Sequence, residues 1–98
     1  METKVLFGVG LVFDTPEFGT IVMGANEELD ELTPSTIKEM IGDQVIIKKT
    51  DGEEQVYEVV STQINYSIAG KKNIGICLGK GISPDDISAG SIVYCYSS

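Results

Sequence analysis

Short runs of alternating apolar and polar residues, separated by turn residues, extend over most of this 98-residue chain. The clearest pair is 45–49 and 55–60, which alternate on either side of Thr50-Asp51-Gly52-Glu53. A period of two is typical of strands with one buried face, and Asp-Gly between two such runs favours a hairpin because the turn needs positive φ values. The pattern therefore predicts an all-β domain.

Further strands are expected at 5–13, 18–24, 62–68, 73–78 and 92–96. In the first of them, Gly8 and Gly10 permit a bend, and the alternation predicts one bulky face made of Val5, Phe7, Val9, Leu11 and Phe13. Six or seven antiparallel strands in one domain over residues 1–98 are expected to close into a small β-barrel, because closure removes free sheet edges.

One short helix is predicted at about 33–41. Thr33 is a suitable N-cap, Pro34 suits the first helical position, and Gly42 favours an end there. The apolar face would consist of Ile37, Met40 and Ile41. We expect this helix to plug one end of the barrel, with an interaction helix as the alternative. A second, one-turn crossing is expected at Ser83-Pro84-Asp85-Asp86.

The charge balance limits the classes of partner. Fifteen acidic residues against seven lysines, with no arginine and no histidine, give a net charge of −8. Phosphate backbones are bound by clustered positive charge, so this balance argues against a dedicated nucleic-acid binder and favours protein partners. No apolar run approaches the ~20 residues that span a bilayer, and the first residues do not resemble a secretory signal. A cytoplasmic protein without membrane contact is expected.

The acidic run Glu27, Glu28, Asp30 and Glu31 is the candidate protein-interaction segment. It lacks the glycine-spaced pattern of a calcium loop, so no metal is predicted there, and a solvated loop is the simpler interpretation.

Catalytic patterns are missing from the sequence. There is no histidine to act as a general base, no nucleophile elbow and no phosphate loop, so we expect no enzyme activity and no cofactor. Cys77 and Cys95 are too far apart for a zinc ribbon or a redox motif and are expected to be structural thiols. A disulfide between them stays open at this stage.

Four segments carry a family resemblance: Gly19-Thr20-Ile21-Val22-Met23-Gly24, Gly42-Asp43-Gln44-Val45, Asn73-Ile74-Gly75-Ile76 and Gly90-Ser91-Ile92-Val93. In this order they resemble domain two, a β-barrel, of elongation factor Tu and related translational GTPases, here as a free-standing domain. The resemblance covers nearly the whole chain at the level of motifs. It implies a closed antiparallel barrel and supports no catalytic role.

The resemblance also implies a ligand site. In elongation factor Tu, this domain helps to hold the aminoacylated end of transfer RNA, and the matching residues here are Phe13 and Asn73. The two acids that the family carries on the first strand are replaced by Gly10 and Leu11.

Two functions are therefore weighed. The first is a non-enzymatic module that docks on a protein through its acidic segment or a barrel edge. The alternative is a reduced barrel for RNA ends or aminoacyl-transfer RNA. A homodimer through the first strand or through the closing run 92–96, where Tyr94 and Tyr96 share a face, is a further interpretation.

Overall fold

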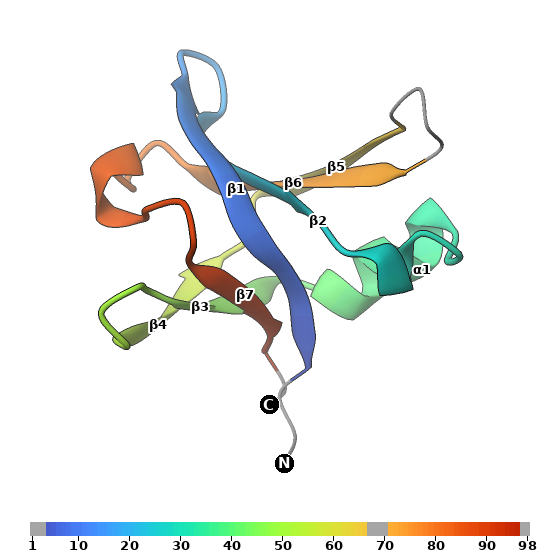
Figure 1. Ribbon diagram of the computed structural model, residues 1–98. Helices are drawn as coiled ribbons and strands as arrows, with labels where there is room; N and C mark the ends of the chain where they lie inside the picture. Colours follow the sequence, from blue (N-terminus) through green and yellow to red (C-terminus); the bar gives the residue numbers. More distant parts are fainter. Residues whose placement is uncertain (1–3, 67–70, 97–98) are drawn as a thin grey trace.

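Seven antiparallel strands form a single curled sheet in the computed structural model, which describes residues 4–66 and 71–96 (Figure 1). The strands are β1 (Val5–Thr15), β2 (Gly19–Ala25), β3 (Gln44–Lys48), β4 (Glu54–Glu58), β5 (Ser61–Tyr66), β6 (Lys72–Gly79) and β7 (Ile92–Cys95). The helix α1 (Pro34–Ile41) and two 3-10 turns, η1 (Glu27–Leu29) and η2 (Pro84–Asp86), complete the described part. The expected all-β class is confirmed.

The order of strands in the sheet is β4-β3-β7-β1-β2-β6-β5, and every neighbouring pair is antiparallel. The first strand therefore lies beside the last one. Beyond the paired residues of β1 and β7, the Cys95 backbone N donates to Lys4 O at 2.8 Å. The start of β1 and the end of β7 consequently lie side by side at the lower end of the molecule in Figure 1.

The predicted closed barrel is not confirmed, because β4 and β5 stand at the two ends of this order and do not pair with each other. The chain nevertheless joins the two ends through two residues. Val59 N donates to Asp43 O, next to β3, and Val60 N donates to Cys77 O of β6, both at 2.8 Å. Two residues thus connect β4, at one end of the strand order, to β5 at the other end. β4 and β5 each keep one edge without a strand partner in the described residues.

The core lies inside the curl of the sheet and receives side chains from nearly every element. Its largest fully buried members are Leu6, Phe7, Leu29, Ile37, Ile41, Ile47, Ile74, Ile76 and Ile87. Ile37 and Ile41 come from α1, whose predicted position is confirmed: Thr33 Oγ1 accepts a hydrogen bond from Thr36 N, and the chain turns at Gly42 with a φ of 65°. Among the described residues, no helix combines the length and the apolar character that crossing a bilayer requires.

The predicted face pattern of β1 is wrong at Val5 and again beyond Val9. At the start of the strand, Val5 is 43% exposed and Leu6 is buried in the core, and the register with β7 shifts between Val5 and Phe7. The register with β2 shifts between Val9 and Leu11, which is a β-bulge at Gly10. A bulge inserts one residue into the two-residue period, so the side chains after it change faces. Phe7 and Val9 are buried in the core, whereas Leu11 is 55% exposed on the outer face of the sheet.

The hairpin between β3 and β4 is confirmed, with a longer turn than a two-residue loop. Gly52 has a φ of 93°, and no residue other than glycine has a positive φ among those described. Asp51 Oδ1 instead accepts a hydrogen bond from Glu53 N at 2.9 Å, so the aspartate orders the turn through its side chain. The strand expected at 62–68 is β5, and residues 67–68 lie outside the described part.

Candidate functional site

A pocket of about 390 Å³ opens on the outer face of the sheet, where β1, β2 and β6 are neighbours. We call it the hairpin pocket. Its lining consists of Gly10, Leu11, Met23, Gly24, Ala25 and Asn73. The walls are mostly apolar, and the Asn73 amide is the polar side chain among them. An apolar hollow of this size with one polar group is typical of a binding site.

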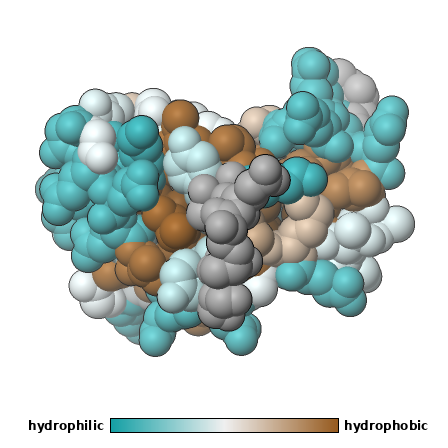
Figure 2. Space-filling view, turned by 90° about the horizontal axis from the view of Figure 1, so that it is seen from below, coloured by the Kyte–Doolittle hydropathy of each residue, from teal (hydrophilic) through white to brown (hydrophobic). Residues whose placement is uncertain are grey.

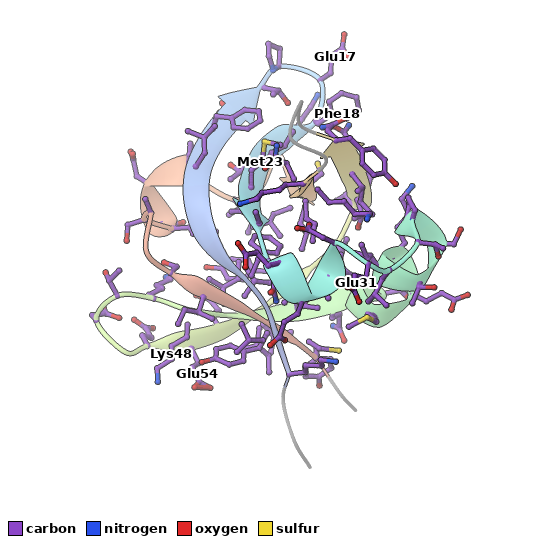
Figure 3. The ribbon with its side chains drawn as sticks, turned by 45° about the vertical axis from the view of Figure 1, so that its right-hand side comes forward. Glu17, Phe18, Met23, Glu31, Lys48 and Glu54 are labelled. Atoms are coloured by element: carbon purple, nitrogen blue, oxygen red, sulfur yellow. The ribbon has the colours of Figure 1, made fainter. Side chains whose placement is uncertain are left out.

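The bulge and the glycines create this hollow. The bulge at Gly10 turns Leu11 outward, opposite Met23 on β2. Gly75, opposite Met23 on β6, places no side chain beside it. Figure 3 shows Met23 and Phe18 near the upper end of the β1–β2 hairpin, where Phe18 is 44% exposed. Leu11 and Met23 are thus the long apolar side chains of the pocket, which is also lined by the backbone of Gly10 and Gly24.

The close approach of β1 and β2 depends on Gly24. A Cβ atom at this position would overlap Gly8 O and Phe7 Cδ1, and it would lie 3.1 Å from the Gly8 carbonyl carbon. A Cβ at Gly75 would make only ordinary contacts, at 3.5 Å from Met23 Cγ and 3.7 Å from Ile21 Cγ2. Gly24 is thus required by packing, whereas Gly75 leaves room.

The two residues expected from the family resemblance are placed differently. Asn73 is exposed at the start of β6 and lines the pocket. Phe13 is half-buried on β1, opposite Ile21, and does not line it. Because Phe13 is two residues beyond Leu11 on an unshifted stretch of β1, it lies on the same outer face, further along the strand.

The acidic segment is a folded element with one buried anchor. Leu29, in the middle of η1, is 2% exposed and belongs to the core. Asn26 Nδ2 donates to Leu6 O of β1 at 2.9 Å, which fixes the start of the segment directly after Ala25 of the pocket. The segment is therefore more ordered than the solvated loop expected from its composition.

Its four acids have different environments. Two hydrogen bonds join Asp30 and Lys72. Asp30 Oδ1 accepts from Lys72 N at 3.0 Å, and Lys72 Nζ donates to Asp30 O. Glu27 forms an ion pair with Lys71 at 3.5 Å, between two well-exposed side chains. Glu28 and Glu31 are exposed, and Figure 3 shows Glu31 on the segment that leads into α1. Asp30 is thus structural, Glu27 is paired with Lys71, and Glu28 and Glu31 are exposed.

Lys72 is 6% exposed, which is unusual for a lysine. Its ammonium group lies 5.2 Å from the centre of the Tyr66 ring in addition to its bond with Asp30 O. Carbonyl and ring together compensate for the loss of water around the charge. This lysine therefore fastens the acidic segment to β6.

A second apolar surface crosses the other half of the sheet. Val56, Ile46, Tyr94 and Val5 are consecutive cross-strand neighbours on β4, β3, β7 and β1, and Val56 and Val5 are 44% and 43% exposed. Figure 2, viewed from below, shows apolar atoms between polar margins on this side of the molecule. A different cavity, of about 340 Å³, is lined by residues 39–44, Cys95 and Tyr96 and includes the carboxylates Glu39 and Asp43.

Both thiols are free. Cys77 is buried on the outer face of β6 and donates to Phe18 O at 2.8 Å, while Cys95 donates to Met40 O at 3.0 Å. Two strands, β1 and β2, separate β6 from β7, so the cysteines are not on neighbouring strands. Each thiol instead holds a loop or helix end against the sheet.

Three comparisons complete the description of the site. No protein-family model, no curated protein and no solved structure matched the chain. Within residues 4–66 and 71–96, no three His, Cys, Asp or Glu side chains lie close enough together to hold a metal ion. The site is therefore interpreted from its own geometry.

Proposed function

We propose that this protein is a non-enzymatic binding module that docks on a partner protein through the hairpin pocket. The observation that carries the proposal is the pocket itself: about 390 Å³, open on the outer face, apolar except for one amide. Such a hollow accepts an apolar side chain, and the Asn73 amide can exchange hydrogen bonds with the backbone next to it.

The charge at one end of the pocket suggests the chemistry of the partner. The acidic segment begins at Glu27, two residues after Ala25, and its exposed acids are Glu27, which is paired with Lys71, and Glu28 and Glu31. Lysine or arginine residues beside the docked side chain would meet these carboxylates. Exposed charges of this kind act mainly on association rate and specificity, while the apolar contact supplies most of the affinity.

An alternative rests on Asn73, which lines the pocket. The resemblance to elongation factor Tu implies that this residue belongs to a ligand site. In this alternative the pocket receives the end of an RNA or of aminoacyl-transfer RNA. The hydrogen bonds of Val59 and Val60 link the two ends of the sheet and support the related proposal that the fold is a barrel of the translation-factor type that stays open between β4 and β5. The protein-docking function is favoured because the pocket lining holds no lysine and the chain has a net charge of −8. A cytoplasmic location belongs to the same proposal.

The test is a selection of displayed random peptides on the purified protein, followed by mapping of the binding site by NMR. We expect a consensus of one large apolar residue flanked by lysine or arginine, with shifts at Gly10, Met23 and Asn73. Leu11→Asp should abolish binding, whereas Val56→Asp, a matched change of an exposed apolar residue on β4, should not. Peptides that bind the Leu11→Asp variant as tightly as wild type would contradict the proposal. The alternative would be favoured if an RNA with the 3′ sequence of transfer RNA changed the NMR signals of Asn73 and was released by added salt.

A further inference from the structure

β5 is an edge strand that carries none of the usual protections against pairing. It stands at one end of the sheet, and β6 is its strand partner among the described residues. Its register with β6 runs without a shift from Ser61 to Tyr66. The sequence Ser-Thr-Gln-Ile-Asn-Tyr holds no charge, no proline and no glycine. Edge strands normally avoid association through lysine, proline, bulges or shortness, so this edge is open to a further strand.

The opposite edge is protected by its charges. β4 carries Glu54 and Glu58 at its two ends, and a two-fold axis through Val56 would place Glu54 of one copy opposite Glu58 of the other. Like charges directly opposite each other destabilise a strand pair. In that register two copies would repel each other at β4, whereas β5 carries no charge.

The residues of β5 are complementary to themselves about a two-fold axis through Ile64. In that register Gln63 faces Asn65 of the other copy, and Thr62 faces the other copy's Tyr66. The side chains of Gln63 and Asn65 lie on the outer face, where both residues are exposed, so the facing amides can exchange hydrogen bonds. Tyr66 is 60% exposed and gains an aliphatic neighbour in Thr62.

We propose that β5 is a dimerisation edge, at which a second copy of this chain pairs antiparallel to the first about a two-fold axis at Ile64. The pairing continues the sheet from one molecule into the other and satisfies the outward backbone groups of both β5 strands. The contact is isologous, so it closes at two copies and leaves no further edge of the same kind. It does not use the hairpin pocket, and thus goes beyond the proposed docking function.

The test uses sedimentation velocity on the full chain over concentrations from about 10 μM to about 1 mM. We expect wild type to dimerise within this range. Gln63→Glu with Asn65→Glu places like charges opposite each other twice and should raise the dissociation constant about tenfold or more. Gln63→Lys with Asn65→Glu places opposite charges there and should lower it about threefold to tenfold.

Lys38→Glu, an exposed change on α1 with the same effect on net charge as the double glutamate variant, is the control and should leave the dissociation constant nearly unchanged. Far-UV circular dichroism checks that each variant folds. At protein concentrations where the Gln63→Glu, Asn65→Glu variant stays monomeric, the Gln63→Lys, Asn65→Glu variant should still dimerise. A wild type that stays monomeric, or two double variants that change the dissociation constant in the same direction, would overturn the proposal. Equal weakening by Lys38→Glu would likewise overturn it, because net charge and not β5 would then govern association.

Discussion

Gly24→Ala tests whether the contact between β1 and β2 is as close as the structure has it. The added Cβ would overlap Gly8 O, a backbone atom that cannot rotate away, and Phe7 Cδ1 in the core. β1 would have to move, which strains the paired stretch Gly8–Ala25 and Val9–Gly24. Overpacking of this kind costs about 1–3 kcal/mol, and each weakened backbone hydrogen bond costs about 1 kcal/mol more. Alanine also lowers the conformational entropy of the unfolded chain, which stabilises the folded state by about 0.4–1 kcal/mol.

The expected net loss is about 2 kcal/mol in the free energy of unfolding. For a domain of this size it corresponds to a fall in Tm of roughly 8–16 °C. Urea unfolding followed by far-UV circular dichroism measures it. Gly75→Ala is the matched control, because its Cβ has only ordinary contacts with Met23 and Ile21, and it should leave stability unchanged or raise it by about 0.5 kcal/mol. A Gly24→Ala variant within about 0.5 kcal/mol of wild type would refute the reasoning.

Three further outcomes are expected. Asp30→Ala should lower the free energy of unfolding by about 1–2 kcal/mol because Lys72 N loses its hydrogen-bond acceptor. Asp30→Asn keeps an acceptor oxygen and should lower the free energy of unfolding less, and urea unfolding of both variants compares them. Thr33→Ala should cost about 1 kcal/mol through loss of the N-cap of α1, and an unchanged denaturation midpoint would contradict the cap. Oxidation of the folded monomer should form no bond between Cys77 and Cys95, and mass spectrometry of peptides from non-reduced protein detects a bond if one forms.

Local sequence signals predicted the elements of this fold well. The helix from Thr33 to Gly42 has a side-chain cap, a proline at its first position and a glycine at its end, and each signal acts within a few residues. Cys77 lies on the outer face and Ile74 and Ile76 lie in the core, as the two-residue period of a strand requires, because β6 pairs with β5 without a register shift from Lys72 to Cys77. Such features need no knowledge of distant contacts.

The remaining features depend on contacts between distant segments. The bulge at Gly10 reversed the expected faces of Leu11 and Phe13, and a glycine in a strand does not by itself distinguish a bulge from a bend. Of the pocket, only Asn73 was expected. Met23 and Ala25 carry no chemical signal, since an apolar residue on a strand has the same sequence pattern whether it lines a hollow or faces water. The structural role of Asp30, which accepts a hydrogen bond from Lys72 N, could not be read from a run of similar acids.

The pairing of β1 with β7 has a consequence for protein engineering. Because Lys4 and Cys95 share a hydrogen bond, a short linker could join the two ends of the domain, and new ends could be opened in the turn at Thr50-Asp51-Gly52-Glu53. Such a circular permutant would keep every strand neighbour while β3 and β4 became the terminal strands. The same closeness of the ends lets the domain be inserted into a surface loop of a host protein without forcing that loop apart.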